Sequence, residues 1–304
     1  MNRRRALAWA AALLALVAGL VALGHDWSSD DSLRRFQAGA PFRIGYAVEP
    51  PYAFLQNDGT VTGEAPEIAR RIAERLGIRA IEWRQMDFAE LLDALEAHRI
   101  DLIAAGMFIT PEREARALFS LPTIHVRPGL LVARGNPRRI IAYQRAAGRA
   151  ELTLAVLSGS VEEQIMRRLG VAEPRLLVVP DALSGRQAVE SRLADALLLS
   201  EPTVRWMARN GQLGQTEMVL PPVEADQAYG ATAFVFAPDA GRLRDAWNAA
   251  LGRYLGSPGH RRLLAGLGLA DPTLPAPAPP APALAPAPAP APAPSPPPQP
   301  DPPR

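Results

Sequence analysis

The chain between residues 41 and 134 alternates short apolar runs with segments whose apolar residues recur every three or four positions. Short runs predict strands, and the longer period predicts helices that bury one face. Ile68, Ile72 and Leu76, for example, lie four residues apart, and Gly77 ends that helix. Strands that alternate with helices indicate an α/β fold with a largely parallel sheet. We expect strands at 42–47, 80–83 and 102–105, and helices at 66–76 and 88–97.

The same alternation restarts further along the chain and predicts a second lobe. We assign 41–134 to lobe 1, 135–222 to lobe 2, and 223–271 to a return into lobe 1. A chain that crosses twice between lobes forms a two-strand hinge, and the cleft between the lobes is then the natural ligand site. The expected elements are strands at 152–157, 176–179, 196–199 and 231–236, and helices at 161–169, 185–193, 241–255 and 260–267.

Both ends of the chain differ from this pattern. Arg3–Arg5 precede an uncharged apolar run over 6–23, the layout of a secretory signal with cleavage before His25. The alternative is an uncleaved membrane anchor, because 18 apolar residues approach the length that spans a bilayer. Either interpretation of residues 1–24 places the folded part in the periplasm, after a linker at 25–40.

Residues 272–304 form a tail that contains 17 prolines, most of them alternating with alanine. Proline removes backbone donors and fixes φ, so this tail cannot form a helix or a sheet. We interpret it as a disordered, polyproline-like spacer, with a ligand for a proline-binding groove as the less favoured alternative.

Composition excludes several kinds of chemistry. The chain has no cysteine, and all 33 of its basic residues are arginines. Disulfides, thiolate metal sites, thiol nucleophiles and Schiff-base lysines are therefore excluded. The net charge of +2 becomes −1 without Arg3–Arg5. The rest of the sequence contains no stripe of basic residues that would indicate nucleic-acid binding. The four histidines lack metal-ligand spacing and no catalytic motif appears, so we expect no cofactor, no metal and no enzymatic activity.

Arg113 is the sharpest candidate for ligand binding. Thr110 and Pro111 predict a helix start directly after the buried strand, with Arg113 in its first turn. Open α/β sheets bind ligands at this end of their strands, and a guanidinium holds a carboxylate with two hydrogen bonds. In lobe 2, Gly159, Ser160 and Val161 begin a helix in the same way and offer free N–H groups to the same anion.

Aromatic residues supply a second kind of candidate. Tyr52, Phe88 and Phe108 each lie where a strand ends or a helix begins, and together they form a box for a delocalised cation. Glu49, which is close to Tyr52 in the sequence, could accept a hydrogen bond from a ring nitrogen of the ligand. Two adjacent acidic residues, Glu162 and Glu163, are expected on a solvated helix face.

Three stretches resemble the family-3 periplasmic solute-binding proteins of ABC importers: residues 49–52, 58–63 and 100–113. The resemblance covers about 41–270 and implies a two-lobed type-II fold with Arg113 as the clamp on a ligand carboxylate. Residues 63–67 and 179–185 are similar to the ectoine and hydroxyectoine branch of that family.

The resemblance to this branch also implies roles for individual residues. Glu49 would bind the ring nitrogen, with Tyr52, Phe88 and Phe108 around the ring. Two positions depart from the wider family: Ser200 stands where amino-acid binders place an aspartate, and Val161 stands where a hydroxyl residue is expected. The missing aspartate fits a ligand whose positive charge is spread over a ring.

The sequence therefore predicts a monomeric periplasmic protein that closes around a small zwitterion and delivers it to an ABC permease in the inner membrane. Ectoine-like solutes come first, and polar amino acids second. A periplasmic enzyme related to cyclohexadienyl dehydratase, with Glu49 or Glu201 as its perturbed carboxylate, is one rival. A membrane-tethered sensor module is another.

Overall fold

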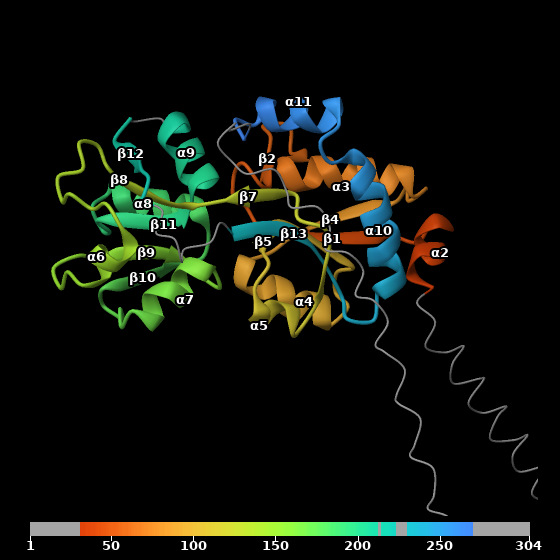
Figure 1. Ribbon diagram of the computed structural model, residues 1–304, viewed down its shortest axis with the longest axis horizontal. Helices are drawn as coiled ribbons and strands as arrows, with labels where there is room; N and C mark the ends of the chain where they lie inside the picture. The colour runs from red at the N-terminus through yellow and green to blue at the C-terminus, as the bar shows by residue number, and fades with distance from the viewer. Residues whose placement is uncertain (1–30, 212–213, 223–229, 270–304) are drawn as a thin grey trace, which may run out of the picture.

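A computed structural model describes residues 31–211, 214–222 and 230–269, which form two α/β lobes (Figure 1). The predicted signal or anchor at 1–24 and the tail at 272–304 lie outside the described residues. Within the described ranges, no helix is long and apolar enough to cross a membrane.

Lobe 1 is built on a sheet with strand order β4-β1-β5-β13-β6, and β7 also pairs with β13. β1 runs parallel to β4 and β5, whereas β13 runs antiparallel to β5, β6 and β7. The strands are β1 (Phe42–Tyr46), β4 (Ile81–Gln85), β5 (Leu102–Phe108), β6 (Leu118–Phe119), β7 (Ile124–Val126) and β13 (Gly230–Phe236), with a separate hairpin of β2 (Phe54–Leu55) and β3 (Val61–Thr62). The helices are α2 (Ser32–Gln37), α3 (Glu64–Arg75), η1 (Phe88–Glu90), α4 (Leu91–Glu96), α5 (Pro111–Glu114), α10 (Gly241–Tyr254) and α11 (Pro258–Gly266).

Lobe 2 repeats this plan, with strand order β10-β9-β11-β8-β12. β9 runs parallel to β10 and β11, and β8 runs antiparallel to β11 and β12. The strands are β8 (Pro128–Ala133), β9 (Leu154–Leu157), β10 (Leu176–Val179), β11 (Ala196–Ser200) and β12 (Thr216–Val219). The helices are α6 (Tyr143–Ala147), α7 (Val161–Arg168), α8 (Ala182–Glu190) and α9 (Glu201–Asn210).

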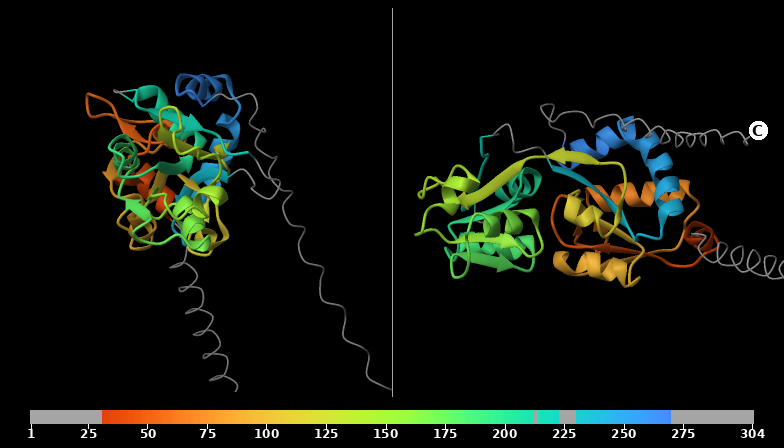
Figure 2. Two further views of the ribbon diagram at one scale, coloured as in Figure 1. Left: turned by 90° about the vertical axis from the view of Figure 1, so that its left-hand side faces the viewer. Right: turned by 60° about the horizontal axis from the view of Figure 1, so that its bottom comes forward.

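The crossing between the lobes differs from the expected boundary. β7 belongs to the first sheet and β8 to the second, so the chain crosses at Arg127 and not near residue 135. The two strands run from one lobe to the other in both Figure 1 and Figure 2. The return from β12 to β13 passes through residues 223–229, which lie outside the described part.

The expected linker at 25–40 also contains structure. Residues 32–37 form α2, and Phe36, at 1% exposure, packs against Phe42 with ring centroids 4.7 Å apart. The core of lobe 1 continues from there to Trp247 on α10, whose ring lies 6.1 Å from that of Phe42 and 5.2 Å from that of Phe234. One buried aromatic cluster thus joins the start of the described chain to the helix that closes lobe 1.

One buried carboxyl group in lobe 1 lacks the partners that burial normally requires. Glu64, the first residue of α3, is 0% exposed, and neither of its carboxyl oxygens has a hydrogen-bond partner among the described residues. Burial raises the pKa of this carboxyl to about 7, and the nearby Thr123 hydroxyl opposes that shift only in part. Ionising it in the folded protein therefore costs stability.

We predict that Glu64→Gln stabilises the protein at pH 8 by roughly 1–3 kcal/mol. The folded-state pKa of about 7 lies above the unfolded value, so the native state binds more protons and loses stability as pH rises from about 5 to 8. Urea unfolding at several pH values measures this loss. A wild-type and variant difference that is the same at pH 5 and pH 8 would contradict the assignment.

Candidate functional site

The carboxyl ends of the parallel strands of both sheets meet at a cavity between the lobes. The space left free inside it would hold about one water molecule, so the lobes are closed on one another. The lining residues come from both lobes: Glu49, Phe88, Gly106, Phe108, Arg113, Leu157, Ser160, Val161, Glu162, Leu199 and Ser200. Seven of the nine predicted site residues are among them.

Arg113 lies at the centre of this arrangement and is 4% exposed. Thr110 caps α5 as predicted, its Oγ1 accepting from the N–H of Arg113 at 3.3 Å. The guanidinium donates to the carbonyl oxygen of Phe108 at 2.9 Å and, across the cleft, to that of Gly159 at 3.0 Å. Burial lowers the pKa of Arg113 to about 10, which leaves it charged at neutral pH, and the charges of Glu162, Glu112 and Glu49 partly oppose that shift.

Two of the three predicted aromatic residues line the cavity. Phe88 begins η1, and the Cζ atom of Arg113 lies 5.6 Å from its ring centroid. Phe108 ends β5 and is half-buried. Tyr52 is 1% exposed and does not line the cavity; its ring packs against Gly106. The structure therefore brings a ring pair to the cavity, with Tyr52 behind it.

Tyr52 and Glu49 instead connect lobe 1 to the start of α9 in lobe 2. The Tyr52 hydroxyl lies 3.0 Å from Ser200 Oγ, and Thr203 Oγ1 donates to Glu49 Oε1 at 2.7 Å. Ser200 and Thr203 also share a hydrogen bond of 3.2 Å. These four buried side chains form one network across the cleft. The sequence analysis did not identify Thr203, because the preceding Glu201 and Pro202 indicate only the start of a helix.

The loop before α7 begins a helix as predicted, but the N–H groups of Gly159 and Ser160 are not free, since they donate to the Glu163 carboxylate and to the carbonyl oxygen of Leu157. Gly159 has a φ of +74°, and a Cβ there would lie 2.9 Å from the Cα of Ala89 in the other lobe. Ser160 caps the helix by accepting from the N–H of Glu163 at 3.0 Å, and the Glu163 carboxylate accepts from the N–H of Gly159 at 2.7 Å. The half-buried Val161 follows as the first residue of α7.

Glu162 is a cavity residue that the sequence interpretation missed. We expected Glu162 and Glu163 on a solvated face, but Glu162 is 6% exposed and lines the cavity. A signal existed: the spacing of Ser160 and Glu163 is that of a capping box, which assigns Glu163 to the cap. Its neighbour Glu162 is turned about 100° away from Glu163 around the helix axis and faces the cleft.

The cavity therefore holds two carboxyl groups and one guanidinium. Burial raises the pKa of Glu49 to about 7; the charge of Glu162 adds to this, while Thr203 and Arg113 oppose it. Burial likewise raises the pKa of Glu162 to about 7, against the opposing effect of Arg113. With both carboxyls ionised the cavity carries one net negative charge, which favours a ligand with a cationic part.

Glu201, the second carboxylate suggested for an enzyme, does not line the cavity. It is 4% exposed and forms ion pairs with Arg127 and Arg205. This pairing holds the crossing at Arg127 against α9, so the role of Glu201 is structural.

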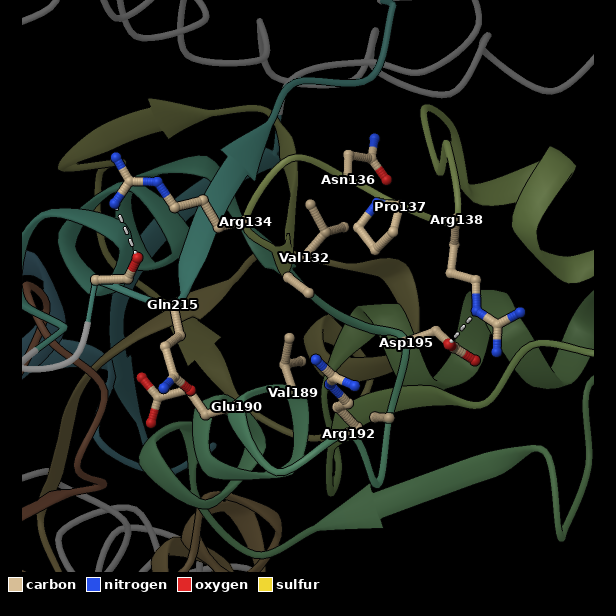
Figure 3. Close-up of a pocket in the computed structure, with 13 residues that line it drawn as sticks. Val132, Arg134, Asn136, Pro137, Arg138, Val189, Glu190, Arg192, Asp195 and Gln215 are labelled. Carbon is tan, nitrogen blue, oxygen red and sulfur yellow. Dashed lines mark hydrogen bonds and ion pairs between the residues drawn. The ribbon is translucent and has the colours of Figure 1, made fainter.

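A separate hollow lies in lobe 2 between β8, β12 and the end of α8 (Figure 3). Two of its three arginines are engaged locally: Arg138 pairs with Asp195 at 2.9 Å, and Arg134 donates to the Gly214 carbonyl at 3.0 Å. None of the predicted site residues lines this hollow. In the described ranges, no group of three acidic or histidine side chains is placed to hold a metal ion.

The sequence model of bacterial extracellular solute-binding proteins, family 3, matches residues 42–263. The chain belongs to this family. A probable periplasmic-binding protein of an amino-acid ABC transporter from Sinorhizobium fredii is 30% identical over 81% of this chain and 82% of its own length. This solute-binding protein therefore functions outside the cytoplasm, as the family does.

Solved structures confirm the type-II fold of periplasmic binding proteins. EhuB in complex with hydroxyectoine has a TM-score of 0.73 at 27% identity, over 79% of this chain and 92% of EhuB. An ancestral amino-acid-binding precursor of cyclohexadienyl dehydratase has a TM-score of 0.68 at 21% identity, over 78% of this chain and 99% of its own, and shows the fold alone.

An enzyme also appears among the relatives. Membrane-bound lytic murein transglycosylase F from Aeromonas hydrophila is 27% identical over 158 residues, which are 52% of this chain and 31% of the enzyme. The match thus spans about a third of that enzyme.

We predict that Gly106→Ala destabilises the protein by roughly 2–5 kcal/mol, because a Cβ there would lie 2.5 Å from the Tyr52 ring at a φ of +63°. Gly170→Ala is the matched control: Gly170 has a φ of +80°, but a Cβ there meets nothing within 4 Å. Only backbone strain of about 1–2 kcal/mol is expected for the control. Equal losses for the two variants in urea unfolding would show that Tyr52 is not held by this contact.

Proposed function

We propose that this protein captures a small zwitterion with a delocalised positive charge, ectoine-like solutes first, and delivers it to an ABC permease of the inner membrane. The observation that carries the proposal is the convergence of one buried guanidinium, two carboxyls and two rings on a single cavity between the lobes. The similarity to EhuB, whose structure contains hydroxyectoine, supports the same ligand class.

Arg113 would bind the ligand carboxylate. Carbonyl oxygens of the two lobes accept two of its five N–H donors, so further donors remain for a ligand carboxylate once the lobes part to admit it. Val161, the first residue of α7, adds a backbone N–H from the other lobe, whereas the N–H of Ser160 donates to the carbonyl oxygen of Leu157. A ligand held from both sides favours the closed arrangement by its differential affinity.

The cationic part of the ligand would lie between the carboxyls and the rings. Glu49 and Glu162 come from different lobes, and Phe88 and Phe108 present faces that attract a cation by about 0.5–2 kcal/mol each. Ser200 is engaged with Tyr52 and Thr203 and offers no charge to an ammonium group.

A polar amino acid is the second candidate, because Glu162 could hold an α-ammonium group in place of the missing aspartate. The raised pKa of Glu49 also suits a general base, so an enzyme with dehydratase-like chemistry is the alternative hypothesis. Turnover of prephenate or arogenate by the purified protein tests that hypothesis.

We propose a monomer without catalytic activity. A mature amino terminus found at His25 would support a free form of the protein over a membrane-tethered one.

We predict that calorimetry detects binding of ectoine or hydroxyectoine, and that Arg113→Ala weakens it at least about 100-fold, since two charge-assisted hydrogen bonds are lost. Arg116→Ala is the control, because Arg116 lies just after α5 but pairs with Asp93 and Glu96 on the surface. Circular dichroism verifies that both variants fold. If calorimetry detects no binding of ectoine or hydroxyectoine but does detect binding of an amino acid, the ligand is a polar amino acid and not an ectoine-like solute.

We predict that affinity for a cationic zwitterion falls as pH is lowered from 8 to 6, by up to about tenfold per unit for each carboxyl that takes up a proton. Glu49 and Glu162, with pKa values of about 7, become neutral in this range and lose their attraction for the cation. Glu162→Gln should reduce the pH dependence. Glu64→Gln, a carboxyl equally buried but outside the cavity, should leave it unchanged. Affinity independent of pH would show that the carboxyls do not hold the cation.

A further inference from the structure

Four buried side chains form a chain of hydrogen bonds that passes twice between the lobes. It runs from Tyr52 of lobe 1 to Ser200 and Thr203 of lobe 2, and back to Glu49 of lobe 1. The three oxygen–oxygen distances along it are 3.0, 3.2 and 2.7 Å. None of the four residues is more than 7% exposed, so water does not compete for these bonds.

The protons of the hydroxyl groups give this chain a direction. A hydroxyl has one proton to donate, and an ionised carboxylate has none. Thr203 donates its proton to Glu49 and must therefore accept one from Ser200. Ser200 must in turn accept from Tyr52, which keeps its proton at neutral pH because burial raises its pKa. All three hydroxyls thus donate in sequence toward the Glu49 carboxylate.

Ser200 takes part in this chain instead of capping its helix. It is the N-cap residue of α9 and a serine, which is among the preferred residues there, yet its side chain makes no capping hydrogen bond. Four other helix starts do have such a bond, made by the side chains of Thr110, Ser160, Asp181 and Ser257. A departure from a local rule at one helix start is typical of a functional site.

The start of α9 is held in place, so Thr203 has little freedom to move. The N–H of Glu201 donates to the carbonyl oxygen of Arg127 at 2.8 Å, and the Glu201 carboxylate pairs with the Arg127 side chain. A Cβ at Gly129 on β8 would lie 2.9 Å from the Cα of Glu201, so the strand and the helix start are in close contact. Thr203, the third residue of α9, therefore presents its hydroxyl to lobe 1 from a fixed backbone.

The Glu49 carboxyl has one oxygen in this chain and one outside it. Oε1 accepts from Thr203, whereas Oε2 makes no hydrogen bond to a described residue and belongs to a side chain that lines the cavity. The charged groups that face Glu49 are Glu162 on α7 and Arg113 on α5. Burial and Glu162 disfavour the ionised form of Glu49; of the two groups that favour it, Thr203 acts more strongly than Arg113.

We propose that this chain of hydroxyls positions Glu49 for ligand binding, with Thr203 as the positioning residue that holds Oε1 and leaves Oε2 to the cation of the ligand. All four members belong to the protein, so the chain forms without a ligand and also joins the two lobes. Ser200 and Thr203 thus substitute for the missing aspartate by holding a carboxylate that comes from the other lobe. The role in binding rests on the proposed function, whereas the effect of Thr203 on Glu49 does not.

The test measures the ionisation of Glu49 directly, in the full chain without ligand. Carbon-13 in the side-chain carboxyls gives one NMR signal for each glutamate, and Glu49→Gln identifies the signal of Glu49. Thr203→Val keeps the shape of the side chain but removes the donor, so the pKa of Glu49 should rise by about one unit. Thr203→Ser retains a hydroxyl and should return the pKa to its wild-type value.

A control variant removes a comparable hydroxyl elsewhere. Thr232 is 0% exposed and shares a hydrogen bond of 3.2 Å with Thr123, but it does not line the cavity. Thr232→Val should leave the pKa of Glu49 unchanged. The proposal is overturned if Thr203→Val does not raise this pKa, if Thr203→Ser raises it as much, or if Thr232→Val does.

Calorimetry with ectoine on the same proteins tests the role of Thr203 in binding. Thr203→Val should weaken binding about fivefold at pH 7, where a one-unit rise from a pKa of about 7 leaves few Glu49 carboxyls ionised, and less at pH 9. A raised pKa of Glu49 without any ectoine binding would contradict the proposed ligand and leave the positioning of Glu49 standing. Ectoine binding with an unaltered pKa of Glu49 in Thr203→Val would support the proposed function and refute the positioning role.

Discussion

Burial of a single guanidinium between the two lobes is the constraint on which the site depends. Arg113 is 4% exposed and keeps its charge at neutral pH, since its pKa is lowered only to about 10. Its N–H groups reach one carbonyl oxygen in each lobe, so the charge is solvated by both halves of the protein at once. Carbonyl dipoles compensate a buried cation incompletely, and a carboxylate placed between them compensates it better.

The identical plan of the two sheets explains why this position exists. In lobe 1, α5 begins shortly after β5, and in lobe 2, α7 and α9 begin shortly after β9 and β11. Each of these parallel strands ends at the cleft, so each helix start lies beside the same cavity. The closed cleft thus contains one guanidinium and two carboxyls, a set that is complementary to a molecule with both signs of charge.

Local signals predict the strands and the helix starts that line the cavity. Thr110 and Pro111 mark a helix start, which located Arg113, and the apolar runs located the strands that end at the cleft. Long-range pairing was not readable in the same way. β8 pairs with β11 and β12, which are distant in sequence, and this moved the lobe boundary to Arg127. Which way Thr203 and Glu162 point depends on how their helices are rotated about their axes. The charged residues next to them in sequence suggest a solvent-exposed face, so the sequence alone does not indicate that these two residues point toward the cleft.

Three carboxyl groups with the same raised pKa have different consequences because of what surrounds them. Glu64 makes no hydrogen bond of normal geometry within the described residues, the nearby Thr123 hydroxyl only partly favours its ionised form, and the carboxyl lies outside the cavity, so its burial is a lasting cost to folding. Glu49 and Glu162 lie beside the cavity, where a cationic ligand would favour their ionised forms. Binding at neutral pH would then release protons from both carboxyls. A cationic ligand would thus pair with carboxyls that burial alone leaves partly protonated, and its binding would favour the closed arrangement.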